Sequence, residues 1–246
     1  MYKNLEHKNS AELCEQMAAE CDTAILAFST GKDSIAAWLQ MRRYFKRIVP
    51  YYCYLVPDLG FVERSLSYYE DFFQTHIYRL PHRSLFRYLR QLLFQPPRRV
   101  LVIEGANICD ERNWSDDIIG EVVRNAARLP AAAYVGTGVR AADSPMRRIG
   151  IATHGPINHN GKRFFPVYDW KKADVIKAID EAGVKLPVDY RMFGRTFDGL
   201  DYRFMAPLKE WFPEDYQKVL DWFPWADLEI ARRDGFDKIG KRERVQ

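Results

Sequence analysis

Short apolar runs and amphipathic stretches alternate along most of the chain. Runs rich in β-branched and aromatic residues predict buried strands, and apolar residues at helical spacing predict helices. We expect strands at residues 24–28, 48–56, 75–80 and 131–136, and helices at 10–21, 32–45, 62–74, 84–94, 118–129 and 171–182. This alternation of strands and helices predicts an α/β fold with a doubly wound, mainly parallel sheet.

Three further segments complete the predicted elements. The apolar run at residues 100–105 is typical of a strand, and Asn160-Gly161 is a turn signal between two strands of a hairpin. From residue 191 the sequence becomes aromatic and is punctuated by proline, which predicts a helical extension with its tryptophans in the core. We therefore expect a nucleotide-binding domain at residues 1–190 and a helical C-terminal extension at residues 191–246, which ends in a solvated basic tail.

Composition narrows the class of protein. Hydrophobic residues make up 47% of the chain and charged residues 28%, which is typical of a globular protein and not of a disordered one. No apolar run reaches the ~20 residues of a membrane span, and the polar start does not resemble a signal peptide, so we expect a cytoplasmic protein with no membrane partner. The net charge of +4 favours a polyanionic small molecule as much as nucleic acid.

The four cysteines are scattered and form no CxxC pair. This spacing argues against a structural zinc site and against a cysteine-ligated iron–sulfur cluster. We expect reduced thiols, with Cys53 in the core. His154 and His159 flank the predicted hairpin, and two histidines without a third ligand are more typical of the surface than of a zinc site.

The first predicted strand runs into a polar turn, STGKDS at residues 29–34, which opens a helix. The first N–H groups of a helix lack partners and the helix dipole is positive there, so this position suits a phosphate. Gly31 allows a close backbone approach, Lys32 supplies a compact positive charge, and Asp33 is a candidate magnesium ligand. A capped helix that binds no ligand is the alternative, because Ser and Asp also favour caps.

Two more polar, glycine-containing turns follow predicted strands, at residues 57–63 and 136–148. In a doubly wound sheet, ligands bind outside the carboxyl ends of the strands, where the strand order reverses. The three turns are therefore expected to surround one crevice. Its carboxylates and arginines indicate a nucleotide site with a second anionic pocket.

These motifs resemble the PP-loop ATP pyrophosphatase superfamily and, within it, the phosphoadenosine phosphosulfate reductase family. The resemblance covers roughly residues 20–200. The family's Ser-x-Gly-Lys-Asp-Ser turn is matched at residues 29–34, its Asp-x-Gly turn at 58–60 with Glu63 following, and its Gly-x-Arg turn at 138–140. The matching residues after the Gly-x-Arg turn are Asp143, Ser144 and Arg147, and the family's Pro-x-x-Asp-Trp segment is matched at 166–170.

The resemblance implies an adenine nucleotide alpha hydrolase-like fold. It implies that the protein binds ATP with Mg²⁺ and cleaves ATP to AMP and pyrophosphate, which adenylates an acceptor. The alternative is that it binds a sulfonucleotide such as phosphoadenosine phosphosulfate (PAPS). The implied nucleotide-binding residues are Ser29, Thr30, Gly31, Lys32, Asp33, Ser34, Asp58, Gly60, Gly138 and Ser144. Asp33 and Asp58 are the implied magnesium ligands. The implied catalytic residues are Lys32, Asp33, Arg140 and Arg147; for the arginines the alternative is a structural ion pair with Asp143.

One departure from the family changes the expected reaction. Sulfonucleotide reductases carry an attacking cysteine in a C-terminal Glu-Cys-Gly-Leu-like segment, and the tail DKIGKRERVQ has none. We therefore expect an ATP pyrophosphatase acting in sulfur transfer or nucleic-acid modification. The alternatives are a reductase that uses a partner's thiol and a non-catalytic nucleotide-binding subunit. The identity of the acceptor stays open. It also stays open whether the chain binds a protein partner, forms a homodimer or binds nucleic acid.

Overall fold

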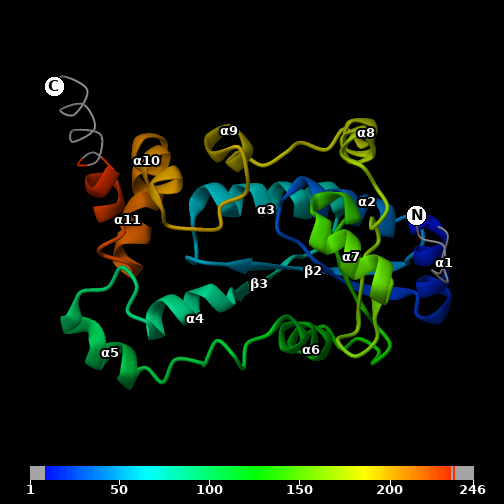
Figure 1. Cartoon of the computed structure of the whole chain (residues 1–246), viewed down its shortest axis with the longest axis horizontal. Helices are drawn as coiled ribbons and strands as arrows, with labels where there is room; N and C mark the ends of the chain where they lie inside the picture. Colours follow the sequence, from blue (N-terminus) through cyan, green and yellow to red (C-terminus); the bar gives the residue numbers. More distant parts are fainter. Residues whose placement is uncertain (1–8, 234, 236–246) are drawn as a thin grey trace. The chain divides into compact units, whose positions relative to one another are not determined.

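The computed structural model describes residues 9–233 and 235, and these include a six-stranded sheet (Figure 1). The strands lie in the order β3-β2-β1-β4-β6-β5. They are β1 (Thr23–Ala27), β2 (Arg47–Tyr54), β3 (Tyr78–Pro81), β4 (Val135–Thr137), β5 (Ile157–Asn158) and β6 (Arg163–Phe164). β1 pairs in parallel with β2 and β4, β4 pairs in parallel with β6, and β5 and β6 form the predicted antiparallel hairpin. The predicted α/β fold with a mainly parallel sheet is confirmed.

The described helices are α1 (Ser10–Glu20), α2 (Lys32–Met41), α3 (Gly60–Phe73), α4 (Arg83–Arg90), α5 (Val100–Gly105), α6 (Asp116–Ala126), α7 (Pro145–His154), α8 (Lys172–Ala182), α9 (Asp189–Phe193), α10 (Tyr202–Trp211) and α11 (Pro213–Trp222), with short 3-10 helices η1 (Pro97–Arg99) and η2 (Ala141–Asp143). The six predicted helices are present, and α7 begins within the turn predicted at residues 136–148, so Arg147 and Arg148 lie on a helix. α8 ends at the left-handed Gly183, as predicted. No helix within the described residues is long and apolar enough to cross a membrane.

Two neighbouring residues of β4 show that helices cover both faces of the sheet. Successive side chains of a strand point to opposite faces. A Cβ added at Gly120 of α6 would lie 3.0 Å from Val135, whereas a Cβ added at the next residue, Gly136, would lie 2.5 Å from Sδ of Met41 in α2. α6 and α2 therefore pack on opposite faces, and Gly136 is small because Met41 occupies the space beside it.

The cap of the first helix lies one residue before Ser10, the first residue of the predicted helix. Asn9, not Ser10, caps α1, and its side-chain oxygen accepts the N–H groups of Ala11 and Glu12. The Ser10 hydroxyl instead donates to the carboxylate of Asp169. Asp169 belongs to the Pro-x-x-Asp-Trp segment, so this motif residue ties α1 to the loop before α8.

The strand predicted at residues 100–105 is wrong, because this run forms α5. A short apolar run fits a buried strand and a helix equally well, and periodicity alone does not separate them. Leu101 and Val102 are strongly exposed on α5. The run is therefore not the buried core element that its composition indicated.

The described chain divides into two compact units, each taken here by itself. The first runs to Cys53 and includes Leu66–Leu80 and Ser115–Leu186, and the second includes Tyr54–Ser65, Pro81–Trp114 and the chain from Pro187. The division therefore passes through α3. The domain boundary predicted at residues 190 and 191 stays a prediction.

Phenylalanines form the aromatic core of the second unit. Phe61 contacts Phe197 and Phe212, with ring centroids 5.6 Å apart in both pairs, and Phe197 contacts Phe204 at 5.4 Å. The prediction of a tryptophan core is wrong, because the tryptophans of this region are partly or half exposed: Trp211, Trp222 and Trp225. The basic tail predicted to be solvated lies outside the described residues.

Candidate functional site

The strand order places a switch point at the centre of the sheet. From β1 the chain moves outward to β2 and β3, and then returns to the other side of β1 with β4. The order of the strands thus reverses between β1 and β4. In an open α/β sheet, this switch point outside the carboxyl ends of the strands is where ligands bind. The STGKDS turn follows β1, and the turn with Gly138 and Arg140 follows β4.

The backbone of the first turn leads directly into α2. Thr30 has a left-handed backbone (φ 59°), and Gly31 occupies the cap position of α2 without a side-chain hydrogen bond to the helix. The hydroxyl of Ser34 donates backward to the carbonyl of Gly31 at 2.8 Å, and it accepts the N–H of Ser29 at 3.3 Å. Ser29 and Ser34 thus hold the turn together, and the cap residue of α2, Gly31, makes no side-chain hydrogen bond to the helix.

Gly138 brings the β4 turn against the start of α2. A Cβ at this position would lie 2.6 Å from the carbonyl carbon of Asp33 and 2.8 Å from the nitrogen of Ser34. These atoms belong to the helix backbone, which does not yield as a flexible side chain does. The absence of a side chain at Gly138 is therefore required for the two turns to meet.

A chain of alternating charges joins the same two turns. Asp33 lies between two cations, with Nζ of Lys32 2.7 Å from Oδ2 and Nε of Arg140 2.9 Å from Oδ1. Asp143 lies between Nη2 of Arg140 and Nη1 of Arg147, each at 2.6 Å. Arg140 is only 5% exposed, so its charge is compensated by the two carboxylates. The ion pair with Asp143, the sequence-based alternative for both arginines, is present.

The Asp33 carboxylate has unused capacity for a ligand. Its Oδ1 is buried and accepts no hydrogen bond, because the nearby Nε–H of Arg140 is not directed at it. A carboxylate oxygen with free lone pairs fits Mg²⁺, which prefers oxygen ligands and is usually held by one or two carboxylates together with phosphates. Within the described residues, no three His, Cys, Asp or Glu side chains gather as a metal site. A magnesium ion at Asp33 would therefore need phosphate or water oxygens for its remaining ligands.

Other predicted residues of the β4 turn have structural partners. The Ser144 hydroxyl caps α7 by accepting the N–H of Arg147 at 3.2 Å. The carbonyl of Trp170 accepts a hydrogen bond from Nη1 of Arg140 at 3.4 Å, and the Ala141 N–H donates to the carbonyl of Tyr168. The Pro-x-x-Asp-Trp segment thus positions the buried arginine.

The second predicted phosphate turn belongs to the other unit, and its helix already has an anionic cap. The carboxylate of Asp215 accepts the N–H groups of Gly60 at 2.6 Å and Phe61 at 2.9 Å at the start of α3. Lys218 contacts Oδ1 of Asp215 at 3.2 Å and donates to the carbonyl of Asp58 at 2.6 Å. The Asp215 carboxylate thus occupies the N–H of Gly60, and the predicted role of Gly60 in nucleotide binding stays a prediction.

The sequence carried no signal for this use of Asp215. The residue lies in the first turn of α11 directly after Pro213 and Glu214, where acidic residues are common because they favour the dipole of their own helix. Asp58 is exposed beside this turn, with a left-handed backbone (φ 58°). Its predicted role as a magnesium ligand stays a prediction.

All four cysteines are free thiols in the structure. Burial is the main cause that raises the pKa of Cys14 to about 12, and the nearby charge of Asp169 adds to it. Burial likewise raises the pKa of Cys53 to about 12, with a further contribution from Asp116. Both thiols are protonated at neutral pH and are poor nucleophiles.

The fold and the site define an α/β protein with a doubly wound, mainly parallel sheet and an uncapped helix N-terminus at its switch point. No family model and no curated protein matches the sequence. Among solved structures, the chain is similar to the NH3-dependent NAD synthetase from Campylobacter jejuni subsp. jejuni NCTC 11168 in complex with the nitrate ion, with 9% identity over 91% of each chain and a TM-score of 0.45. A likeness this distant carries no functional argument, so function is argued from the residues of this chain.

Proposed function

We propose that this chain is a PP-loop ATP pyrophosphatase that binds the phosphates of ATP at residues 29–34 and cleaves ATP to AMP and pyrophosphate, adenylating an acceptor. The observation that carries the proposal is the start of α2, which has no side-chain cap and lies at the switch point of the sheet. Backbone N–H groups and the positive end of the helix dipole favour a phosphate at such a position. Gly138 supports the proposal, because it keeps the β4 turn against this helix start.

The proposed roles follow from the charges of the turn. Lys32 leaves its ion pair with Asp33 and contacts a phosphate, which frees Oδ2 of Asp33. Asp33 holds Mg²⁺, and when bound this ion neutralises charge on the phosphates. Arg140 keeps Asp33 oriented, and Arg147 faces the acceptor. Because the reaction transfers adenylate directly, it requires no protein nucleophile.

A second candidate is a nucleotide-binding subunit without catalysis. It is favoured by the two cations beside Asp33, because a carboxylate already paired with Lys32 and Arg140 binds a metal ion less readily. A sulfonucleotide reductase is not favoured, because the tail of the sequence lacks the attacking cysteine of that family and the raised pKa keeps the thiols of Cys14 and Cys53 protonated.

Incubation with α-labelled ATP and Mg²⁺, followed by separation of the products, distinguishes the candidates. AMP or an adenylated product, formed with pyrophosphate, is expected. ADP as the product would contradict the proposal. Saturable ATP binding with no product, in the presence of a wide set of acceptors, would favour the non-catalytic subunit.

The residue test is Asp33→Asn, which keeps the size of the side chain and removes its charge. We expect a loss of pyrophosphate release of at least about a hundredfold, since charge stabilisation by one such group is worth this much. Asp22→Asn is the matched control, because Asp22 directly precedes β1 and Asp33 follows it, at opposite ends of the strand. Full activity of Asp33→Asn would remove this residue from the mechanism.

A further inference from the structure

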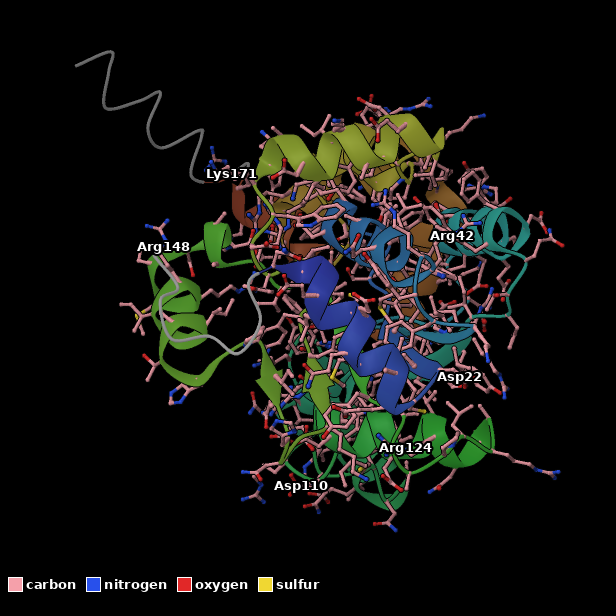
Figure 2. The ribbon with its side chains drawn as sticks, turned by 90° about the vertical axis from the view of Figure 1, so that its right-hand side faces the viewer. Asp22, Arg42, Asp110, Arg124, Arg148 and Lys171 are labelled. Carbon is pink, nitrogen blue, oxygen red and sulfur yellow. The ribbon has the colours of Figure 1, made fainter. Side chains whose placement is uncertain are left out.

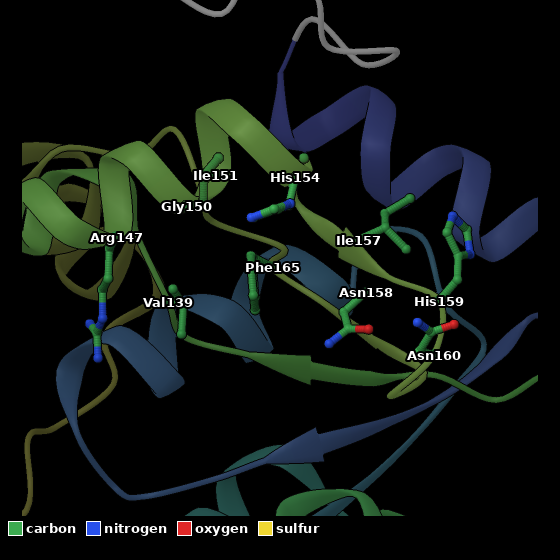
Figure 3. A pocket seen from close by; sticks show the side chains of 11 residues that line it. Val139, Arg147, Gly150, Ile151, His154, Ile157, Asn158, His159, Asn160 and Phe165 are labelled. Carbon is green, nitrogen blue, oxygen red and sulfur yellow. The ribbon is translucent and has the colours of Figure 1, made fainter.

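The first unit contains a pocket of about 670 Å³ between α7 and the β5–β6 hairpin, which we call the α7 pocket (Figure 3). Its lining residues are Val139, Arg147, Gly150, Ile151, His154, Gly155, Ile157, Asn158, His159, Asn160 and Phe165. His154 and His159, which the sequence predicts on the surface, both line this pocket, and no sequence pattern indicates it. The volume is within the range of pockets that take small molecules.

The walls of the α7 pocket are mainly apolar. Val139, Ile151, Ile157 and Phe165 supply aliphatic and aromatic surface, and Gly150 leaves open space where another residue would place a side chain. Burial of an apolar group against such walls is favourable by roughly 25 cal/mol per Å². The pocket therefore suits a ligand with an apolar body.

Polar groups lie at the two ends of the α7 pocket. Figure 3 shows Arg147 and Val139 at one end, and His159 and Asn160 at the other. Of the described residues that line the pocket, Arg147 is the only Lys, Arg, Asp or Glu. A single guanidinium matches one carboxylate group, whereas a polyanion would leave charge without a partner among apolar walls.

Arg147 has donors to spare for a ligand. Its Nη1 pairs with Asp143, and the remaining guanidinium nitrogens have no hydrogen-bond partner among the described residues. The side chain is 50% exposed, so an anion reaches it without disrupting the core. Arginine offers a fork of N–H donors that matches the planar carboxylate.

The end with Arg147 is also the end connected to the nucleotide turn. Val139 directly follows Gly138, whose backbone lies against Asp33 and Ser34. A series of ion pairs links Arg147 to Asp143, Asp143 to Arg140, and Arg140 to Asp33. This series also leads from the pocket to the nucleotide turn. A carboxylate on Arg147 would thus lie at the side of the pocket that faces the proposed phosphate site.

We propose that the α7 pocket binds the acceptor of the adenylyl group, a small organic carboxylate with an apolar body, through Arg147. Its assignment as the acceptor site rests on the proposed function. In the reaction, a carboxylate oxygen forms a bond to the α-phosphorus of ATP, and the bond from this phosphorus to the oxygen bridging to the β-phosphorus breaks. Pyrophosphate leaves with the electron pair, and the product is an acyl adenylate. No oxidant, reductant or net proton transfer is required.

Fluorine NMR of the full chain without ATP tests the binding site. The probes are para-fluorobenzoate, para-fluorophenylacetate and para-fluorophenylpropionate, each compared with its neutral amide. We expect at least one acid to bind in the millimolar range or tighter, and to bind at least about tenfold more tightly than its amide, because hydrogen bonds to a charged carboxylate are stronger than those to a neutral amide.

Two variants of α7 residues locate the binding. Arg147→Gln removes the charge, and Gly150→Leu fills the pocket in a place where an added Cβ meets no atom within 4 Å. Each is expected to weaken the acid at least about tenfold. Gly150→Leu also improves helix propensity, so a loss of binding by this variant cannot come from unfolding of α7. Arg148→Gln is the matched control, because Arg148 does not line the pocket and points outward (Figure 2).

The outcomes separate this proposal from the proposed function. Binding of an acid that is lost in Arg147→Gln and Gly150→Leu and kept in Arg148→Gln supports the site. Failure of all three acids to bind, equal binding of the amides, or equal binding by all variants overturns it, even if AMP and pyrophosphate form from ATP. If the acids bind as expected and ATP is not cleaved, the binding site stands, and the proposed function and the acceptor assignment fail.

Discussion

The turns that begin α2 and α3 share a left-handed residue and have different partners. Each follows a strand of the parallel sheet, and each has a left-handed residue two positions before its helix, Thr30 with φ 59° and Asp58 with φ 58°. The start of α3 is closed by the carboxylate of Asp215, whereas α2 has no side-chain cap. Two turns with a left-handed residue at the same position therefore differ in whether a carboxylate of the chain already closes the helix start.

This difference separates the start of α3, which the chain itself closes, from the start of α2, where we propose that a ligand binds. A helix N-terminus attracts any anion, and a carboxylate of the chain meets the same need as a phosphate. Asp215 is 4% exposed and receives two backbone N–H groups and Lys218. At α3 the anion is built into the protein, and at α2 we propose that it arrives with ATP.

Removing the carboxylate of Asp215 is expected to have the largest effect on the free energy of unfolding. Asp215→Ala leaves the Gly60 and Phe61 N–H groups without an acceptor, and it leaves Lys218 without its carboxylate. We expect a loss of about 3 kcal/mol in the free energy of unfolding, measured with urea, since each unsatisfied buried donor is worth ~1 to 3 kcal/mol. Asp215→Asn, which keeps one acceptor oxygen, should lose less. A loss below about 0.5 kcal/mol for the alanine variant would show that the cap is unimportant.

A second buried carboxylate of the same unit sharpens the comparison. Asp189 is 2% exposed, and its Oδ2 accepts the N–H of Phe197 while its Oδ1 has no partner among the described residues. Burial raises its pKa to about 6. The Asp215 carboxylate receives three donors, whereas Oδ1 of Asp189 receives none, so we expect burial to penalise the charge of Asp189.

The pH dependence of stability tests this expectation. The unfolded chain releases the proton of Asp189 near pH ~4, whereas the folded protein keeps this proton up to a pH of about 6. The free energy of unfolding therefore falls as the pH rises between these two values, and it is level above the higher one. Relative to Asp189→Asn, wild-type stability should fall by about 2 kcal/mol between pH ~4 and pH ~7, measured by urea unfolding. A difference that does not change with pH would contradict the raised pKa.

A side chain at Gly138, beside the start of α2, is expected to lower stability by less than the loss of the Asp215 carboxylate. Gly138→Ala places a Cβ 2.6 Å from the backbone of Asp33, and such overpacking costs about 1 to 2 kcal/mol. We also expect ATP affinity to fall at least about tenfold, because the shift moves the N–H groups proposed to bind phosphate. Equilibrium dialysis with labelled ATP measures the affinity.

Gly105→Ala is the control for this substitution. An added Cβ meets no atom within 4 Å at this exposed helical position, so the variant should be as stable as wild type or slightly more stable. Unchanged ATP affinity in Gly138→Ala would mean that the contact between the two turns plays no part in nucleotide binding.

The sequence by itself determined the order of most elements and the position of the turn after β1. These features are local: apolar periodicity, a polar turn with Gly31 and the start of a helix lie within about two dozen neighbouring residues. The run that forms α5 was one exception, because a short apolar segment fits a strand as well as a helix, and α7, which begins in a predicted turn, was another.

Only the tertiary structure decided which turn remains available for a ligand. Asp215 lies 155 residues after Gly60, and no local pattern indicates that its carboxylate caps α3. The α7 pocket likewise requires the fold, because its walls come from α7, the hairpin and the end of β4. Periodicity and turn chemistry depend on neighbours in the sequence, whereas caps, ion-pair chains and pockets depend on residues that only the folded chain brings together.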